Sequence, residues 1–392
     1  MRAGIQRAGP LLNHCQRRNS YMKKNLTIAA CVVASLGASL QATAGNKDRT
    51  GQSGATELLV NPWAQSTGTF GQNTSFVQGL EAMKGNIAGL AYVENTEIGI
   101  SYTAYLRGSK VSVNNLGIAQ RVGNAGVLGL NIQSMSFGEI QVTNFNNPQG
   151  GVGTYSPQFF NIQAGFGKEF SHAIHAGFGV TYVSEQISNV RASGACFEAG
   201  VQYLTGKRDN FHFGVTLRNV GTNMRFTGEG FSASYDAQDG TYPVNRETPA
   251  DKFQMPTYLN IAAAYDFYLD ENKREDPDAK PKHRLTVMGA FTSNSFLNDY
   301  IGGGVEYSFR EIFALRGGYR YEKSIGDKEQ SQTMYTGLAA GVTIKAPHIG
   351  ANGPSLAFDY SFRQTQRPDN GVHTFSIRFM RPSKRAKDDA AQ

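Results

Sequence analysis

The feature that most constrains this chain is a unit of about ten residues in which apolar and polar side chains alternate, recurring about fourteen times between Thr96 and Phe379. Successive side chains of a strand point to opposite faces, so each unit is predicted to be a strand with one apolar and one polar face. Tilted strands of about ten residues span the hydrocarbon layer of a membrane. The sequence therefore predicts an all-β fold, a transmembrane antiparallel β-barrel of about 14 strands. The last two units show the alternation most clearly (Leu356, Phe358, Tyr360 and Phe362; Phe375, Ile377 and Phe379).

The connections between the expected strands give a second indication of a barrel. Successive connections of an up-and-down barrel lie on opposite sides of the membrane, with long loops outside and short turns in the periplasm. The long gaps 138–158, 221–256, 322–333 and 363–372 all follow odd-numbered strands, which places both ends of the barrel in the periplasm. The long polar gap 268–282 is the exception, and is either a long periplasmic turn or a miscounted strand. A soluble β-sandwich or propeller is the alternative fold, but outward apolar sets in nearly every unit argue against it.

The N-terminus carries a targeting signal. Lys23 and Lys24 precede an apolar run over 28–40 and the small residues Ala42 and Ala44, a pattern typical of a secretory signal peptide cleaved after Ala44. Met22 is a second candidate initiator, which would make 1–21 an upstream extension. Cleavage would leave Cys196 as the remaining cysteine, so we expect no internal disulfide.

The chain therefore divides into four parts. We expect an extension and signal peptide over 1–44, a segment over 45–95 that alternates poorly, the barrel over 96–380, and a basic and polar periplasmic tail over 381–392. The segment 45–95 lies at the periplasmic end of the first strand. It is interpreted as a plug in the lumen or as a periplasmic arm, and the plug is favoured.

Charge and motifs argue against several classes of function. The first 44 residues contain six of the 38 Lys and Arg residues and none of the 31 acidic ones, so the remaining chain is nearly neutral and nucleic-acid binding is not expected. We find no metal motif, phosphate loop or nucleophile elbow, and expect no metal, no cofactor, no catalytic residue and no enzymatic activity. His212, on a polar face, is interpreted as a lumen residue and not as a catalytic one.

Two groups of residues are candidates for function. Charged residues on the polar faces of strands can form a salt-bridge lattice that holds a plug, or can simply line a wet barrel interior. Mixed aromatic and charged residues in the long gaps 221–256 and 138–158 suit recognition of a protein partner, although such loops can also simply shield the barrel mouth. The lumen set is Arg218, Glu306, Arg316, Arg320, Asp359 and Arg378, and the loop set is Arg225, Phe226, Phe231, Tyr235, Tyr242, Phe145 and Tyr155.

Three segments resemble a known family. Residues 85–91 (GNIAGLA) resemble the Asn-Pro-Ala-Gly-Leu element of the FadL family of fourteen-stranded outer-membrane barrels, with Ile87 where proline is usual. Residues 58–64 (LLVNPWA) with 68–71 (GTFG), and the ending 374–379 (TFSIRF), are similar to the PorV/PorQ branch of that family. The resemblance implies a FadL-like barrel in which Asn86, Ala88, Gly89 and Leu90 form a plug motif.

The resemblance also implies a function and partners. Members of this branch are integral components of the cell outer membrane that serve type IX secretion. They bind cargo through its C-terminal signal domain and shuttle it from the translocon barrel SprA (Sov) to a surface sortase attachment complex of PorU with PorQ and PorZ. That complex removes the signal and anchors cargo to anionic lipopolysaccharide. The alternatives are a FadL-type channel for hydrophobic small molecules, which Ile87 argues against in detail, and a lipid A deacylation factor.

Overall fold

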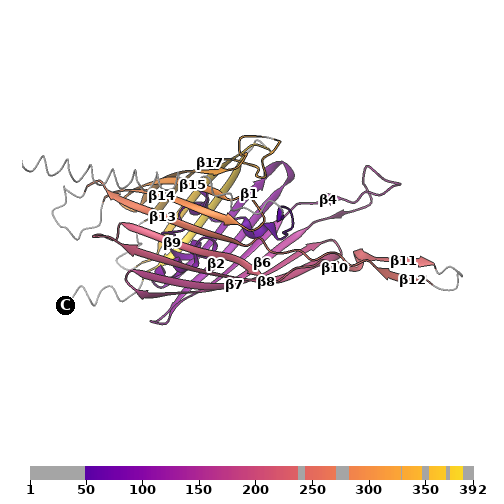
Figure 1. The fold of residues 1–392 in the computed structure, drawn as a ribbon, viewed down its shortest axis with the longest axis horizontal. Coiled ribbons are helices and arrows are strands. Elements are labelled where there is room, and N and C mark those ends of the chain that lie inside the picture. Colours follow the sequence, from indigo (N-terminus) through magenta and orange to yellow (C-terminus); the bar gives the residue numbers. More distant parts are fainter. Residues whose placement is uncertain are drawn as a thin grey trace, which may run out of the picture. The chain divides into compact units, whose positions relative to one another are not determined.

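A computed structural model describes residues 49–236, 243–270, 282–327, 329–346, 353–367 and 371–382. The predicted signal peptide with its cleavage site and the tail beyond 382 lie outside the described residues. The described chain forms one closed antiparallel barrel (Figure 1).

The barrel has fourteen strands, each paired with its neighbours in antiparallel register. Pairing of β1 with β19 and of β8 with β9 closes the ring, and a short extra strand, β10, pairs with β8 at the rim. The predicted fold class is therefore confirmed. The barrel strands are β1 Thr96–Leu106, β2 Val111–Val122, β3 Gly126–Ser136, β6 Gln158–Ser171, β7 Ile174–Ile187, β8 Val190–Thr205, β9 Phe211–Gly221, β13 Tyr258–Tyr268, β14 His283–Asn294, β15 Tyr300–Phe309, β16 Phe313–Glu322, β17 Tyr335–Ala346, β18 Ser355–Thr365 and β19 Val372–Arg381.

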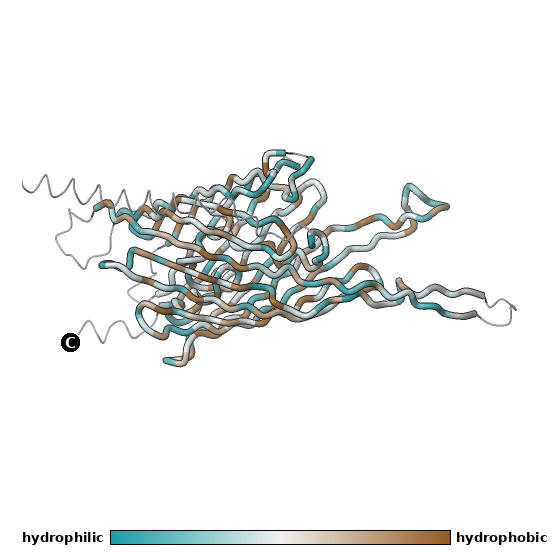
Figure 2. The backbone as a smooth tube through the Cα atoms, viewed as in Figure 1, coloured by the Kyte–Doolittle hydropathy of each residue, from teal (hydrophilic) through white to brown (hydrophobic). Residues whose placement is uncertain are grey.

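The outer face of the barrel is apolar. On β19, Phe375 is 50% exposed whereas its neighbours Thr374 and Ser376 are buried, and exposed apolar side chains recur on the other barrel strands. Figure 2 shows hydrophobic and hydrophilic residues interspersed along the strands. A closed sheet has no unpaired edge, and an apolar exterior matches a lipid environment in place of water. The chain is thus an integral outer-membrane β-barrel.

The connections are unequal at the two rims. The long connections between β3 and β6 and between β9 and β13 lie at one rim and carry two hairpins, which project in the same direction from the barrel (Figure 1). This rim faces outward in barrels of this type. The gap that begins after Tyr268 connects β13 to β14 at the opposite rim, so the strand count was right; 271–281 lie outside the described residues. The hairpins are formed by β4 Ile140–Gln141 with β5 Thr154–Tyr155 and by β11 Ser232–Asp236 with β12 Pro243–Glu247, next to β10 Thr227–Gly228.

The segment that precedes β1 folds into short helical turns inside the barrel. Its largest apolar side chains, Trp63, Leu80, Met83 and Leu90, are fully buried and pack against Ala119 and Val127 of the wall. Of the two interpretations of this segment, the plug is therefore the one observed. The turns are η3 Thr56–Leu59, α2 Ala64–Thr67, η4 Gly79–Lys84 and η5 Ile87–Tyr92; η6 Arg107–Ser109 and η7 Glu229–Phe231 lie in outer connections. Among the described residues, no helix is long and apolar enough to cross a membrane.

Candidate functional site

The plug motif fastens the plug to the wall. The Asn86 side chain accepts a hydrogen bond from the Ala88 amide at 3.2 Å and so caps η5. Its Nδ2 donates to the carbonyl of Val201 in β8 at 3.0 Å and to that of Val215 in β9 at 3.4 Å. One asparagine thus bridges two adjacent wall strands and the first turn of a plug helix.

The other motif residues serve close packing. A Cβ at Gly89 would lie 1.9 Å from the carbonyl oxygen of Val77, so only glycine fits between η5 and the preceding turn. Ala88 and Leu90 are fully buried, and Ile87 begins the 3-10 turn at the position where the family has proline. The loss of the proline ring therefore does not prevent the helical turn from forming.

One buried charge cluster joins the plug to the wall. Arg378 in β19 forms an ion pair with Asp359 of β18 at 3.0 Å. The same guanidinium lies 3.5 Å from Glu81 of the plug and 3.7 Å from Glu97 of β1. Three carboxylates therefore share one arginine, and one of them belongs to the plug.

A second cluster lies on the wall around Glu306. Arg316 contacts its carboxylate at 2.6 Å, and Arg284 contacts it at 3.1 Å and Asp266 at 3.5 Å. His212 contacts Asp266 at 3.1 Å, so it belongs to this network. The Thr286 hydroxyl also donates to Asp266, so His212 lies in a polar network on the inner face of the wall. The expectation that His212 is not catalytic stays a prediction.

The remaining two predicted lumen arginines contact the plug from other sides. Arg218 pairs with Glu198 at 2.8 Å and donates to the plug carbonyls of Lys84 and Met83. Arg320 lies over the rings of Phe70 in the plug and Tyr300 in the wall. All six predicted lumen charges thus lie inside the barrel. Four of them contact the plug directly or belong to a charge cluster that includes a plug residue: Arg218, Arg320, Asp359 and Arg378.

Sequence reasoning missed several members of these clusters. Glu97, Glu198 and Arg284 occupy inward positions of strands, so the alternation could have found them. Glu81 and Lys84 lie in the plug, where no period assigns a direction to a side chain. Their positions are visible only in the folded structure.

Burial perturbs the acidic groups of the plug. Desolvation, together with the repulsion of the nearby Glu185 carboxylate, raises the pKa of Glu57 to about 8. Desolvation raises the pKa of Glu81 to about 7, and the attraction of Arg378 limits this rise. The plug therefore holds carboxyl groups that bind protons near neutral pH, next to the wall of the barrel.

The β4–β5 hairpin exposes apolar side chains beyond the rim. Phe145 is fully exposed and Val152 is 50% exposed, while Tyr155 pairs with Ile140 at the base of the hairpin. Exposed apolar side chains on a projecting hairpin, away from the lipid-facing strands, are suited to contact with another protein. The predicted role of Phe145 and Tyr155 in partner binding stays a prediction.

The predicted residues around the second hairpin separate into two groups. Phe226 packs against Phe253 with ring centroids 5.6 Å apart and covers a buried apolar cluster, while it remains partly exposed. Its predicted role in partner binding stays a prediction. Phe231 ends η7 beside β11, and Tyr235 pairs with Val244 in the hairpin. Arg225 is half-buried, and Tyr242 lies outside the described residues.

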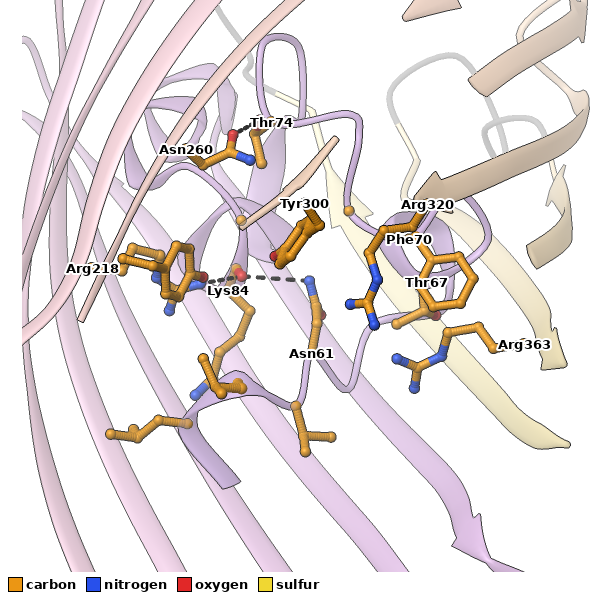
Figure 3. A pocket seen from close by; sticks show the side chains of 16 residues that line it. Asn61, Thr67, Phe70, Thr74, Lys84, Arg218, Asn260, Tyr300, Arg320 and Arg363 are labelled. Atoms are coloured by element: carbon orange, nitrogen blue, oxygen red, sulfur yellow. Dashed lines mark hydrogen bonds between the residues drawn. The ribbon is translucent and has the colours of Figure 1, made fainter. Parts of the chain in front are cut away.

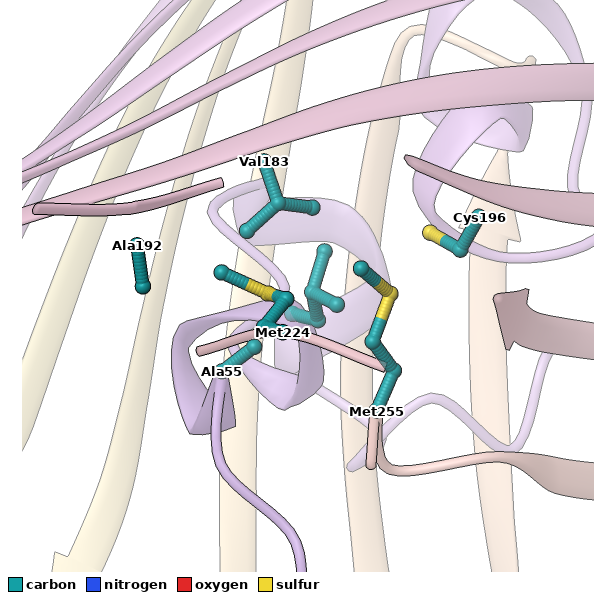
Figure 4. Close-up of a cluster of buried hydrophobic side chains, with 7 residues drawn as sticks. Ala55, Val183, Ala192, Cys196, Met224 and Met255 are labelled. Atoms are coloured by element: carbon teal, nitrogen blue, oxygen red, sulfur yellow. The ribbon is translucent and has the colours of Figure 1, made fainter. Parts of the chain in front are cut away.

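The cluster beneath Phe226 fills the outer end of the lumen between the plug and the wall. It joins Ala55 and Leu58 of the plug to Val183 and Cys196 of the wall and to two methionines of the long connection, Met224 and Met255 (Figure 4). Beside it, the register of β8 and β9 shifts between Phe197 and Ala199. Among the described residues it is one of three apolar clusters between the plug and the wall, together with the cluster around Trp63 and one that joins Val60 to β2 and β3.

No group of three or more His, Cys, Asp or Glu side chains in the described part of the chain is arranged to hold a metal ion. The absence of catalytic residues and cofactors, and the identity of the partners, remain expectations from the sequence.

Comparison with known proteins gives a likeness of fold alone. No protein-family model and no curated protein sequence matches the chain. Among solved structures, the Pseudomonas putida toluene transporter TodX is 12% identical with a TM-score of 0.48, over 82% of this chain and 97% of that chain. The CymD monoaromatic hydrocarbon channel is 11% identical with a TM-score of 0.45, over 83% of this chain and 98% of that one. A Pseudomonas aeruginosa FadL homologue is 10% identical with a TM-score of 0.46, over 81% and 97%.

Proposed function

We propose that this barrel is a non-enzymatic binding subunit of protein secretion, which holds secreted proteins at the cell surface through its two outer hairpins. The observation that carries the proposal is the combination of a lumen occupied by a plug with two hairpins that extend beyond the outer rim. The plug leaves the outer surface as the place where a large substrate can be recognised.

The lining of the lumen supports this division of roles. A passage for hydrophobic molecules requires a continuous apolar path, whereas the plug is held by buried ion pairs of Arg378 and by the carboxamide of Asn86. Buried ion pairs bind their partners in fixed geometry and are costly to break. The plug is therefore built to stay in place.

The hairpins supply two means of binding a protein. Each two-stranded hairpin has backbone groups on its outer edges that can pair with a strand of another protein. The exposed Phe145 adds an aromatic anchor of the kind that dominates binding energy at protein interfaces. Backbone pairing and side-chain anchoring together suit recognition of a common domain carried by many different cargoes.

The finer form of the proposal takes its partners from the family resemblance. The chain resembles PorV, also called LptO, a component of type IX secretion. In this form it collects cargo by the C-terminal signal domain at the SprA (Sov) translocon and delivers it to PorU with PorQ and PorZ, for anchoring to lipopolysaccharide.

The test is to shorten each hairpin without disturbing the barrel. Replacing 143–152 or 232–247 by a short Gly-Ser turn should leave a folded barrel, seen as a heat-modifiable band on electrophoresis, and should abolish pull-down of a cargo signal domain. Both replacements spare Met224 and Phe226, which pack inside the rim. A matched control shortens the outer connection 323–334, which carries neither hairpin. Undiminished cargo binding by both hairpin variants would reject the proposal.

The second candidate is a channel for hydrophobic small molecules, the role that the names of TodX and CymD give to those proteins. In this chain it is favoured by the cluster around Met224 and Met255, next to the shifted register of β8 and β9. Uptake of toluene or a fatty acid into liposomes containing the purified protein would support it. Uptake no faster than with liposomes containing a plugged unrelated barrel would eliminate it.

The non-enzymatic part of the proposal has its own test, because the third alternative is deacylation of lipid A. Purified protein incubated with lipid A should leave its acyl chains intact by mass spectrometry. Release of fatty acid that scales with the amount of protein would make the chain an enzyme.

A further inference from the structure

The outer half of the lumen contains a pocket with an unusual charge balance. Four cationic side chains line it, Lys84 from the plug and Arg218, Arg320 and Arg363 from the wall (Figure 3). No Asp or Glu side chain lines it within the described residues. Arg320 and Arg363 each lie two positions from the outer ends of β16 and β18, which places the pocket toward the outside of the membrane.

Two of the four cations have no ion pair in the described residues. Arg218 is paired with Glu198, and Arg320 lies 3.6 Å from Glu322. Lys84 and Arg363 are each at most 6% exposed, yet neither is matched by a carboxylate. The pocket therefore carries a surplus of two positive charges in a site that is shielded from water.

The guanidinium of Arg363 is the sharpest sign of a missing partner. Its Nε and Nη2 atoms are buried and donate to no acceptor in the described part of the chain, and Nε of Arg320 is in the same state. The Arg363 guanidinium lies 4.9 Å from the centroid of the Tyr335 ring, which fixes its orientation while these two donors have no acceptor. Buried donors without acceptors cost free energy, which a bound acceptor would recover.

The charge on Lys84 is preserved at neutral pH. Desolvation, with the repulsion of Arg218, lowers its pKa to about 8, so the ammonium form still predominates at pH 7. Glu57, a carboxyl group of the plug that lies beside Glu185, has its pKa raised to about 8 by desolvation and by Glu185. At pH 7, Glu57 is therefore mostly neutral, and the main attraction on the Lys84 ammonium comes from Glu198, which already forms an ion pair with Arg218.

Neutral donors complete the lining. Figure 3 shows Asn61 between Lys84 on one side and the guanidinium groups of Arg320 and Arg363 on the other, with Tyr300 above it. The cavity measures about 90 Å³, several times the roughly 10–15 Å³ that one water molecule needs. Its size and its donors suit one compact group with several acceptor oxygens.

We propose that this pocket binds a phosphoryl group through the unsatisfied donors of Arg363 and Arg320, with Lys84, on the other side of Asn61, adding the attraction of its positive charge. A guanidinium group donates two parallel hydrogen bonds to a pair of phosphate oxygens, and a lysine ammonium adds a point charge. A dianionic tetrahedral group would therefore offset the two unpaired positive charges and accept hydrogen bonds from the unsatisfied donors. The phosphoryl group could belong to free phosphate or to the headgroup of a lipid in the outer leaflet. The site does not depend on whether the hairpins bind cargo.

Calorimetric titration of the detergent-solubilised mature protein distinguishes these sources. Inorganic phosphate and a short-chain phosphatidic acid are titrated separately, each against the wild type, Arg363→Gln and Lys84→Met. A matched variant, Arg191→Gln, removes one positive charge from β8, whose Arg191 contacts Ser184 and Tyr182 away from the pocket. Heat-modifiability on electrophoresis confirms that each variant has folded.

We expect the wild type to bind at least one of the two probes, and each pocket variant to weaken that binding by at least tenfold, with Arg191→Gln unchanged. Binding of inorganic phosphate indicates a site for free anions, and binding of phosphatidic acid alone indicates a lipid headgroup. The proposal is overturned if the wild type binds neither probe at millimolar concentration. It is equally overturned if both folded pocket variants bind as well as Arg191→Gln.

Discussion

Asn86 and Gly200 fit together so closely that any side chain at position 200 would displace the Asn86 carboxamide. A Cβ at Gly200 would lie 2.0 Å from Oδ1 of Asn86. The side-chain nitrogen of Asn86 donates to the carbonyl of Val201, the residue that follows Gly200 in β8. The docking of the plug therefore depends on a missing side chain in β8 as much as on the asparagine. The wall thus leaves room for the asparagine at Gly200, and the asparagine in turn donates a hydrogen bond to the wall at Val201.

We expect Gly200→Ala to displace the Asn86 carboxamide and loosen the plug. Overpacking and loss of the two hydrogen bonds should together cost about 2–6 kcal/mol of stability. The measurement is the temperature at which heat-modifiability is lost, together with protease cleavage of the plug in folded protein. Gly303→Ala in β15 is the control, because a Cβ there meets its nearest atom at 3.4 Å. Equal behaviour of the two variants would show that the Asn86 contact is not what seats the plug.

Arg378 should be the most sensitive of the lumen charges. Arg378→Met leaves Glu81, Glu97 and Asp359 buried without their shared cation, and removal of one partner of a buried ion pair costs about 3–5 kcal/mol. Adding Glu81→Gln should restore part of the loss, because it removes one of the unpaired carboxylates. The free energy of unfolding in urea is the measurement, and Arg310→Gln in an exposed periplasmic turn is the control. A double variant no more stable than Arg378→Met would contradict the coupling.

Glu57 should make stability depend on pH. Its pKa is raised to about 8 in the folded protein, above its ordinary value of 4.5, so the folded state holds the proton more tightly than the unfolded state does. This contribution to stability is complete below pH 4.5 and is lost as the pH rises to about 8. We expect Glu57→Gln to flatten the fall of the thermal unfolding midpoint between pH 5 and pH 8, measured by intrinsic fluorescence. If Glu57→Gln left the slope of the unfolding midpoint against pH unchanged, the Glu57 carboxyl group would have to be ionised over this whole range. Glu139→Gln, at an exposed position, serves as the control.

Two phenylalanines of the outer loops should behave in opposite ways. Phe145 is fully exposed, so Phe145→Ser should leave the unfolding midpoint unchanged and weaken binding of a cargo signal domain. Phe226 packs on Phe253 over the methionine cluster, so Phe226→Ala should lower stability by about 1–3 kcal/mol. Thermal unfolding and pull-down are measured on both variants. If Phe145→Ser bound cargo as well as the wild type, this residue would have no part in recognition.

The amino-acid sequence by itself determined the barrel, its strand count and the inward direction of the lumen charges. Thr374, Phe375 and Ser376 illustrate why: the side-chain direction in a strand follows from a backbone period of two, which can be read from neighbouring residues alone. The same period placed Arg218, Arg316 and Arg378 inside the lumen before any pairing was known.

Only the tertiary structure decided what these side chains contact. The plug has no regular period, so its position in the lumen, the approach of Glu81 to Arg378 and the presence of Lys84 and Arg363 around one pocket depend on contacts between segments far apart in the chain. The sequence placed Phe226 in a long loop, and only the fold shows that this side chain packs, partly buried, on an apolar cluster of plug and wall residues. Local periodicity reports the direction of a side chain, whereas packing of an irregular segment against a distant wall is decided by shape and charge at the place where the two meet.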